Sequence, residues 1–116
     1  ESGARLTFNS DNPGSDHSIF YGLHSAITRQ DKDAQPEGGW FKEESVNIDE
    51  AVRAYTSWSA YASFREDLTG IIEVGRWADL SIMNVDPFMI SDDSPIDLLD
   101  GEILMTIVNG VIIYEK

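Results

Sequence analysis

Cysteine is absent from this 116-residue sequence and basic residues are scarce: 8 Lys and Arg stand against 21 Asp and Glu, a net charge of −13. Without cysteine the chain has no disulfide framework and no thiolate metal site. Because phosphate groups are bound by Lys and Arg, we expect no nucleic-acid partner and no docking on an anionic membrane. No apolar run approaches the roughly 18 residues of a membrane span, so none is predicted.

Other absences concern the start and the size of the chain. The sequence opens with Glu1-Ser2-Gly3 and has no methionine before Met83, so we expect a processed or trimmed product, or a piece of a longer protein. No basic region followed by an apolar stretch indicates a signal peptide. We therefore expect a cytoplasmic location, and secretion stays open. A complete (β/α)8 barrel is excluded because it needs about 250 residues.

The first part of the chain has a mixed strand and helix pattern. Residues 5–9 alternate apolar and polar side chains and predict a short strand that ends in a turn. Apolar residues at helical spacing predict an amphipathic helix over residues 16–28. A second helix is expected from Asn47, which with Glu50 has the spacing of a capping box, followed by another helical turn or two over residues 60–64.

The last part of the chain has a β-strand pattern. Residues 80–85 form an apolar run that predicts a strand, and residues 91–102 predict a polar loop or short helix. The runs at 103–108 and 111–114 flank Asn109-Gly110. That pair predicts a two-residue β-hairpin turn, because both of its positions require a positive φ.

Asp11 is the first candidate for chemistry. It directly follows the expected strand, and side chains at the carboxyl ends of barrel strands form active sites. A carboxylate in that place can ligate a metal or accept a proton from metal-bound water. The alternative interpretation is that residues 10–13 form an Asx turn without a catalytic role.

His24 belongs to the first expected helix, and Arg29 stands at its end. His24 lies among apolar residues, which favours a packed, hydrogen-bonded core histidine over a ligand. It stands seven residues from His17, the only other histidine, and this is not the spacing of a helical metal pair. Arg29 closes the helix, where it could bind a substrate anion or simply complement the negative helix end.

Five segments, taken in order, resemble the C-terminal part of the metal-dependent amidohydrolases. The resemblance is to amidohydrolase family 3 and its deformylase-like branch, and it covers nearly the whole chain. The most specific segment has the pattern G-x-I-x-x-G-x-x-A-D-L. The segments are residues 8–13, 22–29, 47–56, 70–80 and 106–114.

The resemblance implies an α/β fragment with two parts. Residues 1–68 would be the last strand and helices of a (β/α)8 barrel, and residues 69–116 would form part of a small composite β-sandwich. Asp11 would be the catalytic aspartate that touches the metal and moves the proton of the attacking water. His24 and Arg29 would lie near the substrate pocket and could bind substrate.

The activity implied by the resemblance is hydrolysis of a non-peptide C–N bond in an amide, formamide or cyclic amide. Zinc or another divalent metal would activate the water, with Asp11 as a ligand only in the intact enzyme. Because the family's other ligands are missing from this sequence, we expect the chain alone to bind no metal tightly and to be inactive.

Two other functions stay open. The chain could be a non-catalytic assembly or binding module, since its apolar strands at residues 103–114 would seek a partner strand. It could also be an acidic protein-interaction domain unrelated to hydrolysis. The expected partners are a small-molecule amide substrate and, for the strands, a second copy of the chain or the missing N-terminal part.

Overall fold

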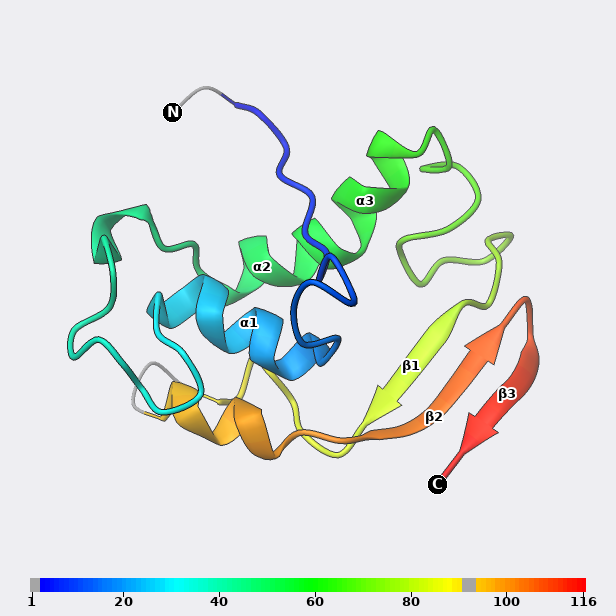
Figure 1. The fold of residues 1–116 in the computed structure, drawn as a ribbon. Helices are drawn as coiled ribbons and strands as arrows, with labels where there is room; N and C mark the ends of the chain where they lie inside the picture. The colour runs from blue at the N-terminus through cyan, green and yellow to red at the C-terminus, as the bar shows by residue number, and fades with distance from the viewer. Residues whose placement is uncertain (1–2, 91–93) are drawn as a thin grey trace.

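The computed structural model describes residues 3–90 and 94–116. Its helices gather on one side, and a three-stranded sheet extends beside them (Figure 1). Two of the helices, η1 and η2, are 3-10 helices. In chain order the elements are α1 (Ile19–Thr28), η1 (Lys42–Glu44), α2 (Ile48–Tyr55), α3 (Ser57–Ala62), β1 (Leu80–Met83), η2 (Pro95–Asp100), β2 (Ile103–Val108) and β3 (Val111–Glu115).

The helix predicted over residues 16–28 is present but begins later, at Ile19. Ser18 is its N-cap, and the Ser18 Oγ atom accepts a hydrogen bond from the Tyr21 N–H at 3.4 Å. Residues before an N-cap lie outside the helix. The C-cap is Arg29, whose φ of 61° ends the helix in the left-handed conformation.

The capping box predicted at the start of α2 is confirmed. The Asn47 side chain accepts from the Glu50 N–H at 2.9 Å, and the Glu50 carboxylate accepts from the Asn47 N–H at 3.1 Å. Thr56, with φ −124° and ψ −95°, breaks the helical path after Tyr55. The helical turn expected over residues 60–64 therefore occurs earlier, as α3.

The strand predicted over residues 5–9 is wrong. The segment pairs with no strand among the described residues and instead runs across α2. The Phe8 N–H donates to the Ala54 carbonyl at 3.2 Å, and the Phe8 ring meets the Tyr55 ring edge-on with centroids 5.6 Å apart. An alternating sequence forms a strand only where a neighbouring strand offers backbone hydrogen bonds, and none lies beside this segment.

The sheet is antiparallel, with strand order β1-β2-β3. The predicted hairpin is confirmed, because Asn109 (φ 48°) and Gly110 (φ 78°) turn the chain between β2 and β3. β1 ends at Met83, two residues before its predicted end at residue 85. The described residues contain neither a closed barrel nor a second sheet, so the description as barrel end and sandwich stays a prediction.

The core joins the two parts of the chain. Leu23 of α1, Ala51 of α2 and Leu98 of η2 pack together, each with at most 2% of its surface exposed. At the end of η2, the Gly101 backbone lies so close to the Phe20 ring that a Cβ atom would be 2.2 Å from it. The segment after residue 69 is thus packed on α1, and the proposed boundary at residues 68 and 69 stays a prediction.

The solvent-accessible surface area of the chain is large for its size. It exposes 8144 Å², whereas a compact monomer of its 12.9 kDa exposes about 6,300 Å². Every residue of β3 is exposed, including Ile112 and Ile113 at 53% and 63%. The sheet extends beside the helices (Figure 1), and the apolar side chains of β3 are exposed.

Candidate functional site

Asp11 lies in a tight turn between the N-terminal segment and α1. Its φ of 51° is in the left-handed region, which non-glycine residues rarely adopt. The Asn9 Oδ1 atom accepts a hydrogen bond from the Asp11 N–H at 2.8 Å, and the Gly14 N–H donates to the Asp11 carbonyl at 2.6 Å. The bond that makes the Asx turn uses the Asn9 side chain and leaves the exposed Asp11 carboxylate out of it.

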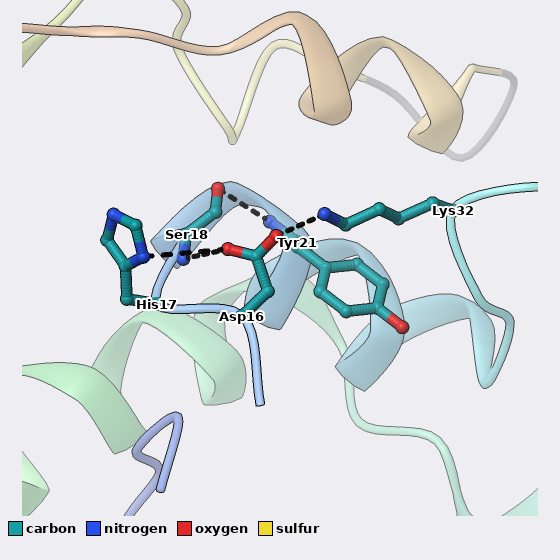
Figure 2. A network of polar contacts seen from close by, with 5 residues as sticks. All are labelled: Asp16, His17, Ser18, Tyr21 and Lys32. Atoms are coloured by element: carbon teal, nitrogen blue, oxygen red, sulfur yellow. Dashed lines mark hydrogen bonds and ion pairs between the residues drawn. The ribbon is translucent and has the colours of Figure 1, made fainter. Parts of the chain in front are cut away.

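The other end of this turn is held by Asp16, as Figure 2 shows. The Asp16 Oδ1 atom accepts from the Ser18 N–H at 2.8 Å, while Oδ2 accepts from the Lys32 ammonium group. The His17 Nδ1 atom lies 4.0 Å from Oδ1. The Lys32 ammonium also lies 5.0 Å from the centre of the Tyr21 ring. The network thus joins the start of α1 to the loop that follows the helix.

This network is electrostatic. The hydrogen bond from Lys32, and after it the bond from the Ser18 N–H, lowers the pKa of the Asp16 carboxyl. The same contact with Asp16 raises the pKa of Lys32. Asp16 is therefore charged and engaged at neutral pH, which makes it an anchor of the turn rather than a candidate for proton transfer.

His24 is fully buried on α1. Neither of its ring nitrogens has a hydrogen-bond partner within the described part of the chain, and burial lowers the pKa of its imidazole, partly offset by Asp31. The predicted packing of His24 is confirmed, but the hydrogen bonds expected with it are missing. Its role in substrate binding stays a prediction.

Arg29 holds the loop that follows α1. Its Nε–H donates to the Trp40 carbonyl at 3.0 Å, and the Trp40 N–H donates to the Arg29 carbonyl at 2.9 Å. The guanidinium carbon also lies 5.4 Å from the Trp40 ring centre, within the range of a cation–π contact. These contacts show a structural role at the helix end, and anion binding by Arg29 stays a prediction.

The residues at hand do not complete a metal site. A catalytic zinc takes about three protein ligands and an open position. Within residues 3–90 and 94–116, no three His, Cys, Asp or Glu side chains come together closely enough to hold a metal ion. Asp11 could supply one ligand at most.

No helix in the described part of the chain is long and apolar enough to cross a membrane.

Comparison with known proteins decides the family. The profile of the amidohydrolase family matches residues 1–114. The chain belongs to this amidohydrolase family. It is 33% identical, over all of its 116 residues, to N-substituted formamide deformylase of Arthrobacter pascens, and 36% identical over 95 residues (82% of the chain) to YtcJ of Bacillus subtilis (strain 168). These matches confirm the resemblance to amidohydrolase family 3 and its deformylase-like branch.

The fold is also similar to two solved structures. An amidohydrolase from Thermotoga maritima MSB8 matches 64% of the chain with a TM-score of 0.51 and 20% identity. A crystal structure of an uncharacterized protein matches 78% of the chain, with a TM-score of 0.52 and the same identity. The chain corresponds to only 17% and 20% of these two structures, and to 17% and 20% of YtcJ and the deformylase.

The sequence alone missed most contacts around the candidate residues. The ion pair between Asp16 and Lys32 joins residues 16 apart, and Arg29 meets Trp40 across 11 residues. Periodic sequence patterns do not predict contacts between loops. One signal was available: Asn9 stands two residues before Asp11, and asparagine commonly accepts a hydrogen bond from the N–H two residues on.

Proposed function

We propose that this chain is the C-terminal part of a longer, metal-dependent amidohydrolase that cleaves a non-peptide C–N bond in an amide, a formamide or a cyclic amide. Family membership and a relative named N-substituted formamide deformylase support the bond type. The chain spans about a fifth of the length of its curated relatives, so most of the active site would come from the rest of the protein.

The observation that carries the proposal is the Asp11 carboxylate, exposed at a turn that is fixed at both ends. In this role Asp11 accepts a proton from the attacking water while the water oxygen bonds to the carbonyl carbon. It then delivers that proton to the leaving nitrogen as the C–N bond breaks. A positioned carboxylate of this kind contributes a rate factor of about 10² to 10⁴.

Metal dependence and the finer roles rest on the family alone. A divalent metal such as zinc would polarise the substrate and the water, with Asp11 as one ligand and the remaining ligands outside this chain. His24 and Arg29 would act on substrate only if the complete enzyme presents them to its pocket. A cytoplasmic location stays a prediction as well.

The test is Asp11→Asn in the full-length protein that contains this chain, assayed on formamide, amide and cyclic amide substrates. Loss of the proton acceptor should lower kcat by about 100-fold or more, with the fold unchanged. Asp31→Asn is the matched control, because Asp31 also lies exposed in a turn, where its Oδ1 accepts from the Asp33 and Gln35 N–H groups at 2.9 Å. Equal kcat for the Asp11 variant and the unmodified protein would refute the proposal.

A second candidate, a non-catalytic assembly module, is favoured by the uncovered sheet. The surface of this chain in excess of a compact monomer is about 1,800 Å², which is more than the roughly 800 Å² that one partner buries in a standard protein interface. The partner would be a second copy or the N-terminal remainder of the protein. That neither nucleic acid nor a membrane is a partner remains a prediction from the net charge. Light scattering on the isolated chain separates these partners, since a dimer mass supports a second copy.

A further inference from the structure

We propose that Asn9 is a positioning residue for Asp11, an inference that rests on the proposed catalytic role of Asp11. Its side-chain oxygen accepts the hydrogen bond from the Asp11 N–H at 2.8 Å. Asn9 does not react; it sets the backbone conformation from which the Asp11 carboxylate extends.

The need for such a contact comes from the conformation of residue 11. Asp11 has φ 51°. Aspartate visits the left-handed region more readily than most residues with a Cβ atom, but this conformation still costs free energy and persists as a single state where its surroundings hold it. The Asn9 side chain supplies that constraint from the N-terminal side, as an Asx turn does. Without this acceptor, residue 11 would be free to return to a negative φ, and its carboxylate would point elsewhere.

Gly14 lies against Asp11 on the other side of the turn. A Cβ atom on Gly14 would lie 2.9 Å from the Asp11 carbonyl oxygen, 3.2 Å from Oδ2 and 3.7 Å from Cγ. All three of these nearest atoms belong to Asp11, so its side chain lies directly against the bare Cα of Gly14. The φ of Gly14 is not in the left-handed region. The glycine is therefore required for space and not for its backbone freedom.

The exit of the turn is held independently. Asp16 accepts from the Ser18 N–H at 2.8 Å and from Lys32, which ties the chain to the first turn of α1 (Figure 2). Only four residues separate Asp11 from this anchor, so the backbone of the turn has few alternative conformations. The bond made by Asn9 therefore decides the direction of the carboxylate at a fixed location.

The expected effect follows from the sensitivity of proton transfer to geometry. A displacement of about 1 Å at a reacting group can cost about 100-fold in rate. Because the contact of Asn9 is with the Asp11 backbone, a role confined to positioning should change kcat and leave KM unaltered. A residue that only stabilises the fold would change neither once the protein is folded.

The experiment compares Asn9→Ala with Asn9→Ser in the full-length protein, with kcat and KM measured on the best formamide or amide substrate. We expect kcat to fall about 10- to 100-fold in the alanine variant, with KM within about twofold of the unmodified protein. Serine keeps a short acceptor oxygen without adding charge, so it should recover most of kcat. Asn84→Ala is the matched control, because Asn84 Oδ1 accepts from the Glu102 N–H at 2.7 Å, at the sheet, and kcat should be unchanged.

Gly14→Ala is the second variant and covers the case in which Asn9→Ala does not fold. The new Cβ would lie 2.9 Å from the Asp11 carbonyl oxygen and 3.2 Å from Oδ2, so residue 11 and its carboxylate should shift together and kcat should fall. Full kcat in a folded Asn9→Ala variant overturns the inference, and so does a serine variant as slow as the alanine one. Where Asn9→Ala does not fold, full kcat in Gly14→Ala overturns it. If Asp11→Asn itself keeps full kcat, the proposed function fails first; if only Asp11→Asn is inactive, the role of Asn9 alone is refuted.

Discussion

The carboxylate of Asp16 and the ammonium group of Lys32 form an ion pair that spans the length of α1 along the chain (Figure 2). The pair connects the turn that carries Asp11 to the loop beyond the helix, where Arg29 meets Trp40. Two loops that the sequence separates by a helix are thereby held against each other.

Replacing Lys32 by methionine removes this connection and should lower Tm slightly. The contact lowers the pKa of Asp16 below its ordinary 3.8 and raises the pKa of Lys32 above 10.5. The stabilisation is therefore complete between these values. It is lost as pH falls through the folded pKa of Asp16 or rises through that of Lys32. Thermal unfolding at pH 7 and near pH 3 measures this, and an equal Tm difference at both pH values would contradict it. Because both groups are partly exposed, the difference should also shrink in 1 M salt.

Asn47→Ala should destabilise the protein by about 1 kcal/mol, because it removes the side-chain acceptor that caps α2. The Glu50 N–H would lose its partner, and the reciprocal bond from the Asn47 N–H would weaken with it. Urea unfolding measures the loss. Asn47→Asp keeps an acceptor at the same position and should retain the stability, so an equal loss in both variants would show that the cap is not the cause.

The capping box shows which features the sequence could predict. Asn47 and Glu50 act through hydrogen bonds between residues three apart, and the Asn109-Gly110 turn needs only two neighbouring positive φ values. Interactions between residues this close in sequence can be predicted from short motifs. The strand predicted over residues 5–9 depended on a partner strand, which no local pattern supplies, and this prediction was wrong.

For the candidate site, too, the sequence predicted the local features and not the long-range contacts. Asp11 was identified by its place after an apolar segment and by the resemblance to a family, and its left-handed turn is seen in the structure. The geometry around it was not predictable, because Lys32 reaches Asp16 only after α1 and its loop have folded back. Burial of His24 followed from helical periodicity, but the absence of hydrogen-bond partners within the described residues did not.

Leu98→Ala tests whether η2 holds the two parts of the chain together. The Leu98 side chain is fully buried against Leu23 and Ala51, so its truncation should cost about 2–5 kcal/mol of unfolding free energy. Leu104→Ala removes the same atoms from a side chain that is 37% exposed on β2, and it should cost much less. Chemical denaturation compares the two, and equal losses would show that η2 is not part of the core.

His24→Met should increase stability at neutral pH and reduce its dependence on pH. Burial sets the pKa of His24 in the folded state below its ordinary 6.5, so the unfolded chain binds the proton more readily. Above pH 6.5 the imidazole is neutral in both states, and the unfolding free energy does not depend on it. As pH falls below 6.5 the unfolded state takes up the proton first, so the unfolding free energy decreases. Methionine has no ring nitrogens to leave without partners, so the variant should gain about 1 kcal/mol at pH 7.

Urea unfolding of the His24→Met variant at pH 7 and pH 5 checks this prediction. The unmodified protein should lose more unfolding free energy between these values than the variant does, because burial lowers the pKa of the His24 imidazole in the folded state below its ordinary 6.5. His17→Gln is the control, since the His17 side chain is 85% exposed and beside Asp16. If removal of His17 flattened the pH dependence and removal of His24 did not, the coupling would belong to the network of Asp16 and not to the core.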